Sequence, residues 1–291
     1  MELLRQLNKS FSVCGYEDEI QEVVRNYFSQ KYDVRVDQLG NVIAHKGGRG
    51  AHYVFLAPMD VPGAFLNVKK EGDSYFYTKL TPSFKTTNGS SGRSREGIEG
   101  VFCVDEKKPE LSHFKTDGLV IKLPTVAEVT VPFSFENNFV KSRHCALYSI
   151  LKLSEKLCEE KTTVTFIALA QTSLRNRGAF GAIPQGADCY FVIEPYENEH
   201  FKVGNGSILC LKDGEYIMPL VLKERLKHRF ENLLVCEDKQ SLSGCLAKRK
   251  GGCMVASVKL PVADLRTDKE QFSFKDVDDL ISRIGDIVKK G

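Results

Sequence analysis

Two sections with alternating helix and strand patterns enclose a middle section that has strand patterns only. Three stretches carry apolar residues at helical spacing, at 17–31, 140–159 and 274–290. Three short apolar runs are typical of buried strands, at 52–57, 163–170 and 188–193. This order predicts an α/β fold in which helices cover a mixed sheet built from 1–65 and 137–291, with a small β-rich domain inserted at 66–136.

One stretch inside the middle section, at 86–100, is rich in Gly, Ser and Arg. It lacks the Gly-Lys-Ser or Gly-Lys-Thr that a phosphate-binding loop requires, so we do not interpret it as a nucleotide site. Composition of this kind is typical of a segment that runs over the protein surface. We therefore predict an exposed loop there.

The charge of the chain is nearly balanced, with 41 Lys and Arg against 38 Asp and Glu. No basic stripe interrupts that balance, so nucleic acid is not an expected partner. The longest apolar runs are far shorter than the roughly 20 residues of a membrane-spanning helix, and the first residues do not resemble a signal peptide. We expect a cytoplasmic protein without membrane contact, in which the nine cysteines are mostly reduced.

Several short motifs, in the same order along the chain, resemble the di-zinc aminopeptidases. They are the segment from Ser12 to Glu19 (Ser-Val-Cys-Gly-Tyr-Glu-Asp-Glu), the segment 37–44 (Asp-Gln-Leu-Gly-Asn-Val-Ile-Ala) and the segment 274–277 (Phe-Lys-Asp-Val). That family includes glutamyl aminopeptidase, the tetrahedral dodecameric aminopeptidases and proteins once labelled cellulase M. The resemblance covers nearly the whole chain. It implies a zinc-aminopeptidase-like fold whose insert is of the dimerisation type.

The family binds two zinc ions through five ligands, and the first two positions have changed here. The family motif Ala-His-Met-Asp corresponds to Ala-Pro-Met-Asp at 57–60, so Pro58, which offers no donor atom, replaces a His ligand. Asp60 is retained in the cleft. The bridging Asp corresponds to Lys141, whose ammonium would repel a dication, whereas Arg143 keeps the arginine of the same motif.

The other three ligand positions and the general base lie later in the chain. The family motif Glu-Glu-x-Gly-Leu-Arg-Gly-Ala corresponds to 172–179, so Thr172 stands at the base position and Ser173 at a ligand position. A hydroxyl does not act as a base near neutral pH without an activator. Glu194 is the one ligand retained, and Arg266 replaces a His.

These replacements predict that no di-metal centre forms and that no cofactor is bound, because four of the five ligands and the base are missing. Two lost ligands have become cations. We therefore expect Lys141 or Arg266 to pair with Glu194 and Asp60, since an unpaired buried carboxylate is costly. The alternative is that these are unrelated solvated charges in an open cleft.

Three interpretations of function follow from the resemblance. The first is an inactive pseudo-peptidase that binds a peptide or small molecule in the old cleft, or assembles with an active paralogue, and forms a homo-oligomer. The second is a metallo-aminopeptidase with a relocated or single-metal site that holds zinc or cobalt. The third, a glycan-related role, rests on the cellulase label alone, and no suitably placed pair of carboxylates supports it.

Overall fold

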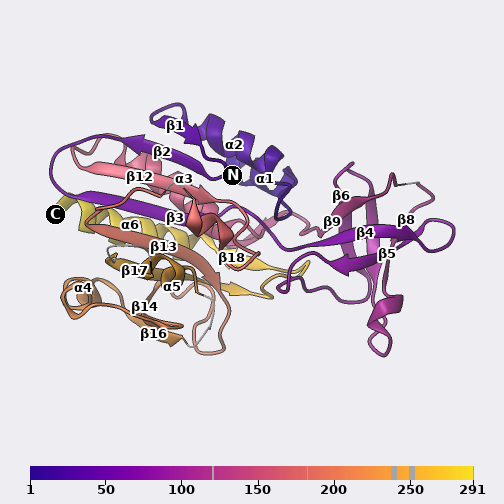
Figure 1. Ribbon diagram of the computed structural model, residues 1–291. Helices are drawn as coiled ribbons and strands as arrows, with labels where there is room; N and C mark the ends of the chain where they lie inside the picture. The colour runs from indigo at the N-terminus through magenta and orange to yellow at the C-terminus, as the bar shows by residue number, and fades with distance from the viewer. Residues whose placement is uncertain (120, 182, 237–240, 249–252, 291) are drawn as a thin grey trace.

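A large mixed sheet with helices and a separate β-barrel make up the computed structural model, which describes residues 1–291 apart from 120, 182, 237–240, 249–252 and 291 (Figure 1). The α-helices are α1 (Glu2–Lys9), α2 (Asp18–Phe28), α3 (Cys145–Leu157), α4 (Leu220–Leu226), α5 (Leu242–Ala247) and α6 (Phe274–Lys290). Short 3-10 helices are η1 (Pro109–Leu111), η2 (Arg177–Phe180) and η3 (Lys227–Arg229). In the described part of the chain, every helix is too short or too polar to cross a membrane.

The large sheet is mixed, as expected from the sequence. Its main path runs β1 (Asp33–Val36), β2 (Val42–Lys46), β12 (Thr163–Leu169), β3 (His52–Pro58), β13 (Cys189–Tyr196), β17 (Val255–Ala263), β18 (Gln271–Ser273), β11 (Phe139–Lys141) and β10 (Ser134–Glu136). Beside β17 lie β14 (Ile208–Asp213), β15 (Tyr216–Ile217) and β16 (Asn232–Cys236). The four neighbours β12, β3, β13 and β17 are parallel.

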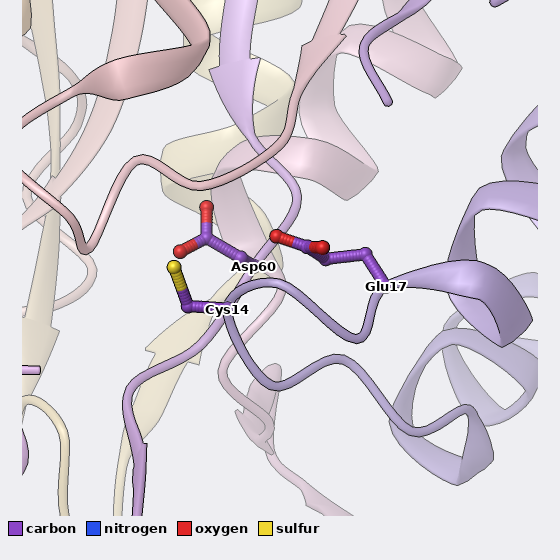
Figure 2. A group of neighbouring side chains, drawn as sticks. All are labelled: Cys14, Glu17 and Asp60. Atoms are coloured by element: carbon purple, nitrogen blue, oxygen red, sulfur yellow. The ribbon is translucent and has the colours of Figure 1, made fainter. Parts of the chain in front are cut away.

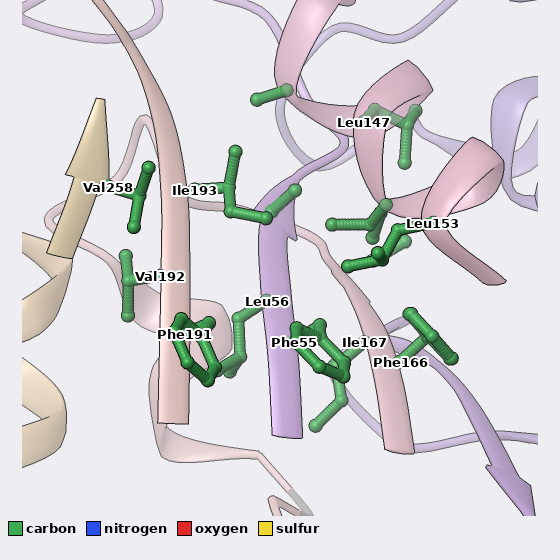
Figure 3. Close-up of a cluster of buried hydrophobic side chains, with 14 of the residues drawn as sticks. Phe55, Leu56, Leu147, Leu153, Phe166, Ile167, Phe191, Val192, Ile193 and Val258 are labelled. Carbon is green, nitrogen blue, oxygen red and sulfur yellow. The ribbon is translucent and has the colours of Figure 1, made fainter. Parts of the chain in front are cut away.

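An aromatic row crosses the middle of this sheet. Phe166, Phe55 and Phe191 are aligned in register on the neighbouring parallel strands β12, β3 and β13. Their rings stack, with centroids 5.0 Å apart for Phe55 and Phe166 and 5.4 Å apart for Phe55 and Phe191 (Figure 3). Such continuous apolar strands form because helices shield the sheet from water. The stack fixes the register of the three strands whose ends build the site described below.

Helix α3 lies between α2 and α6 and packs against β3, β12 and β13. It is buried along most of its length, which explains its largely apolar sequence. The helix begins at Cys145, five residues later than the pattern at 140–159 predicted. Residues Phe139–Lys141 instead form β11, because they pair with β10 on one side and β18 on the other.

Six strands close the barrel, in the order β4 (Gly63–Lys69), β5 (Ser74–Lys79), β8 (His113–Thr116), β7 (Glu99–Cys103), β6 (Ser90–Ser94) and β9 (Thr125–Val129). The predicted loop at 86–100 is wrong in part, since Ser90–Ser94 is a barrel strand. Glycine is needed there because a Cβ on Gly92 would lie 2.4 Å from the ring of Phe102. Close packing on a buried aromatic core therefore explains the glycine at position 92.

The barrel overlaps most of the range predicted for the insert, 66–136, but its two ends differ. Its first strand begins at Gly63, and its last strand ends at Val129. Strand β10, at Ser134–Glu136, pairs with β11 and so belongs to the large sheet. The difference arises because the chain re-enters the sheet as a β10–β11 hairpin before α3 begins.

Candidate functional site

A pocket of about 360 Å³ lies where the parallel strands β3, β13 and β17 and the loop after β12 come together at their carboxyl ends. This edge of a parallel sheet is where ligands bind in many α/β proteins. Of the site residues predicted from the sequence, all but Lys141 line it: Pro58, Asp60, Arg143, Thr172, Ser173, Glu194 and Arg266. The fold therefore brings residues from distant parts of the chain into one cavity.

Lys141 is placed away from the expected ion pair. It is the last residue of β11, where its side chain is exposed, and it lies opposite Gln271 of β18. Among the described residues it forms no ion pair within 4.0 Å. The expectation that Lys141 pairs with Glu194 or Asp60 is wrong, because the segment continues the sheet instead of starting the helix.

Lys259 is the cation that pairs with Glu194. The two residues are aligned on the neighbouring parallel strands β17 and β13, and Lys259 Nζ lies 2.7 Å from Glu194 Oε2. The same ammonium lies 3.0 Å from Oδ2 of Asp213, at the end of β14, and Ser257 Oγ also donates to that oxygen at 2.7 Å. Lys259 is only 5% exposed. Burial disfavours its charge, but Glu194 and Asp213 outweigh burial and raise the pKa of Lys259.

The position of Lys259 in the sequence already indicates a buried lysine with a partner. A lysine inside the apolar run 255–263 is unusual, since lysine is almost never fully buried without a partner. Arg266, the other expected cation, has an exposed side chain at the pocket wall. Its backbone amide, and not its guanidinium, donates to Glu270 at 2.6 Å. The expected pairing of Arg266 with Glu194 is therefore also wrong.

Asp60 is held by hydrogen bonds and not by a side-chain cation. Its Oδ1 accepts from the backbone amide and the hydroxyl of Thr172, both at 2.7 Å, and its Oδ2 accepts from the amide of Ser173 at 2.9 Å. The hydroxyl at the expected base position thus donates to a carboxylate. No lysine or arginine of the described residues pairs with Asp60, contrary to our expectation.

A thiol and a second carboxylate lie beside Asp60 (Figure 2). One ligand atom from each of Cys14, Glu17 and Asp60 lies within 4.8 Å of the other two, and all three residues are buried. Burial, with Asp60 as the second cause, raises the pKa of Glu17 to about 7 and that of the Cys14 thiol above its usual range. In the sequence, Cys14 and Glu17 belong to a motif that indicates the fold, and nothing there predicts that they lie close to Asp60.

Contacts of the segment before α2 explain why Cys14 and Glu17 lie close to Asp60. Val13 forms a parallel bridge with Val61, and the amide of Cys14 donates to the carbonyl of Val61 at 3.0 Å. Glu17 precedes the first turn of α2, and its Oε1 accepts from the amide of Gln171 at 2.8 Å. The loop before α2 is therefore fixed between the loops that follow β3 and β12.

Arg143 connects the pocket with the barrel. Its guanidinium lies 3.6 Å from Oε2 of Glu128 on β9 and also donates to the carbonyl of Val129. On the pocket side, burial raises the pKa of Glu270 to about 7, although the Arg266 amide and the Arg143 charge act in the opposite direction. Arg143 thus serves as a buried link between the two parts of the molecule.

The pocket loops hold residues in an unusual backbone conformation. Gln171, Arg175 and Asn176 after β12, and Asp264 and Arg266 after β17, all have φ between 53° and 68°. Residues other than glycine rarely adopt this left-handed region, at a cost of about 1–3 kcal/mol where it is strained. Such conformations concentrate at ligand-binding sites.

Comparison with known proteins gives one consistent result. No family model matches the chain. The lysyl aminopeptidase of Pyrococcus furiosus is 23% identical over an alignment 336 positions long, which covers 96% of this chain and 94% of that protein. The resemblance to aminopeptidases drawn from short motifs is therefore confirmed over the whole chain.

Solved structures establish the fold. A TET aminopeptidase from a marine sediment archaeon of the Thaumarchaeota superposes with a TM-score of 0.87 and 17% identity, and covers 100% of this chain and 96% of its own. The Pyrococcus horikoshii TET1 peptidase, which can assemble into a tetrahedron or a large octahedral shell, gives a TM-score of 0.80 at 16% identity, over 99% of this chain and 98% of its own. The predicted zinc-aminopeptidase-like fold is confirmed.

Proposed function

We propose that this chain, which has the fold of the tetrahedral aminopeptidases over its whole length, binds a peptide or small molecule in the old catalytic cleft without hydrolysing it. One observation carries the proposal. Glu194, the one acidic residue left at the family's five metal positions, is engaged by the ammonium of Lys259 at 2.7 Å. The Lys259 ammonium thus binds the carboxylate that a metal ion would need as a ligand.

The remaining positions do not fit two zinc ions. Zinc is bound by imidazole, thiolate and carboxylate donors, and Pro58, Lys141 and Arg266 offer none of these. The hydroxyl of Ser173 is not among the usual zinc donors either. We derive no hydrolytic step through a metal pair at these residues.

The base position gives independent support. Proton removal from a nucleophilic water needs a group with free acceptor capacity and a suitable pKa. Thr172 instead uses its hydroxyl to donate to Asp60 Oδ1 at 2.7 Å. No step of peptide hydrolysis is therefore assigned to Thr172.

Features of the pocket support retained binding. Its volume of about 360 Å³ lies within the range of small-molecule sites. The loops at its wall keep Arg175 and Arg266 in left-handed conformations, which a site under no constraint would tend to lose. A retained cavity without a complete catalytic set favours binding over turnover.

The test compares hydrolysis with binding. Purified protein, supplied with zinc or cobalt, is assayed against chromogenic lysyl, glutamyl and leucyl substrates, with Pyrococcus furiosus lysyl aminopeptidase as the active control. We expect no turnover above that of metal in buffer, while tripeptides with the same first residues raise the melting temperature of the protein. Metal-dependent turnover would contradict the proposal, and its loss in Glu194→Gln would place the activity at the family's metal position.

A metallo-aminopeptidase with a relocated single metal is the second candidate. The close approach of Cys14, Glu17 and Asp60 favours it, because thiolate and carboxylate are both zinc donors. Turnover that survives Glu194→Gln but is lost in Cys14→Ser would support this candidate against the first.

We also propose that the chain assembles into a homo-oligomer. The support comes from solved structures of this fold, one of which is a dodecamer and another of which forms a tetrahedron or an octahedral shell. Light scattering coupled to size-exclusion chromatography measures the mass directly. A mass of 32.6 kDa, that of one chain, would contradict assembly.

A further inference from the structure

We propose that Cys14, Glu17 and Asp60 form a binding site for one divalent cation of the zinc type, Zn²⁺ or Co²⁺, beside the old cleft. The three side chains come from the loop before α2 and the loop after β3 (Figure 2). This site uses none of the five positions at which the family binds its metal pair. The inference is independent of whether the protein hydrolyses peptides.

The donor set is chemically suited to such an ion. Zinc and cobalt bind thiolate sulfur at about 2.3 Å and carboxylate oxygen at about 2.0–2.2 Å. Around one ion, donors at these distances are separated by roughly 3.5 Å in tetrahedral geometry. The ligand atoms of Cys14, Glu17 and Asp60 already lie within 4.8 Å of one another, so small side-chain movements close the site.

Backbone amides of one loop fix the two carboxylates. Three consecutive residues, 171–173, donate their amides to Glu17 Oε1, Asp60 Oδ1 and Asp60 Oδ2. Ligating carboxylates in metal sites are commonly held by hydrogen bonds of this kind. A carboxylate has about four lone-pair sites, so both groups retain capacity to bind an ion.

The charge of the group lacks a side-chain counterion. In the part of the chain that the structure describes, no lysine or arginine lies within 4.0 Å of the Glu17 or Asp60 carboxylate. Elsewhere in the pocket, by contrast, Glu194 has Lys259 as its cation. Two adjacent buried carboxylates repel each other as anions, and a bound dication compensates that repulsion.

The position of Asp60 connects the site to solvent. Asp60 lines the pocket, whereas Cys14 and Glu17 are buried and are not among its lining residues. An ion held by three protein donors therefore keeps a fourth coordination position for water or for a donor atom of the pocket's ligand. Binding replaces the thiol proton of Cys14, which is released to solvent.

Cobalt titration of the full-length protein tests the site. The protein is first treated with a chelator and then titrated with Co²⁺ alone, followed by its absorption spectrum. We expect one ion per chain and a near-ultraviolet band from thiolate-to-cobalt charge transfer. Cys14→Ser should abolish that band. Glu17→Gln should weaken cobalt binding by at least about tenfold, because loss even of a residue that only supports a metal ligand weakens binding by about 10–100-fold.

Matched controls make the result specific. Cys245→Ser removes a partly exposed cysteine outside the cluster, whose sulfur lies 3.8 Å from Asn176 Nδ2, and should leave the band unchanged. Melting temperatures without metal verify that each variant folds. The proposal is overturned if the wild-type protein shows no thiolate band, if the band persists in Cys14→Ser, or if Glu17→Gln binds cobalt as the wild type does.

Discussion

Lys259 and Glu194 lie opposite each other on adjacent parallel strands, and the ammonium of one is 2.7 Å from the carboxylate of the other. Asp213 completes the group from β14, at 3.0 Å from the same ammonium. The positive charge beside Glu194 is thus provided by the protein's own side chain. The predictions below follow from this and from three other buried contacts.

Lys259→Met should destabilise the protein strongly. The substitution keeps the apolar stem but leaves Asp213, which is fully buried, and Glu194 without their cation. Removing one partner of a buried ion pair costs about 3–5 kcal/mol, and we expect the lower end because Glu194 is 21% exposed. Urea unfolding measures the loss in free energy of unfolding.

Lys141→Ala is the matched control for that measurement. Lys141 is exposed on β11, so its removal should change the free energy of unfolding by less than about 0.5 kcal/mol. Equal losses in the two variants would show that the buried pair at Lys259 does not stabilise the fold.

Glu128→Gln should weaken the link between the barrel and the sheet. Glu128 is 2% exposed and contacts both Arg143 and Arg93, so its loss leaves the buried Arg143 guanidinium without a carboxylate on that side. We expect a loss of about 3 kcal/mol. Glu99→Gln, an exposed change on β7, serves as the control, and a similar loss there would argue against a specific role for Glu128.

Gly100→Ala should disturb the barrel core. A Cβ at this position would lie 2.4 Å from the carbonyl oxygen of Lys115 and 2.7 Å from the ring of Phe114. Overpacking of this kind costs about 1–3 kcal/mol. Thermal melting reports it, and Gly47→Ala, where a Cβ meets nothing within 4 Å, should leave stability nearly unchanged.

Glu270→Gln should alter how stability depends on pH. The carboxyl has an ordinary pKa of 4.5, and burial raises it to about 7 in the folded state. Between these values the folded protein holds a proton that the unfolded chain has lost, so ionisation of Glu270 lowers stability as pH rises from about 4.5 to about 7. The variant lacks this loss.

Urea unfolding of both proteins at about pH 5 and about pH 8 checks the sign. The stability of the variant relative to the wild type should rise with pH across that interval. A constant difference between the two proteins would show that Glu270 titrates at its ordinary pKa.

Local patterns were sufficient for much of the architecture. The helix at Phe274–Lys290 was predicted with the bounds that the structure gives, because its apolar residues repeat at helical spacing up to the chain end. The strand Ser90–Ser94 was missed because the glycines around it resemble loop composition. Close packing on Phe102 and Phe114 explains Gly92 and Gly100. The sequence predicted which residues lie at the site, but not which residues they contact.

By itself, the sequence determined the order of the elements and which donor atoms are available at each position, since a Pro, a Lys or a Ser has the same donor atoms in any fold. Only the tertiary structure decided which charges meet. Glu194 and Lys259 are 65 residues apart in the chain, and Cys14 and Asp60 come from separate loops. Their contacts depend on strand register and on the bridge between Val13 and Val61, because electrostatic interactions are set by distance in space and not along the sequence.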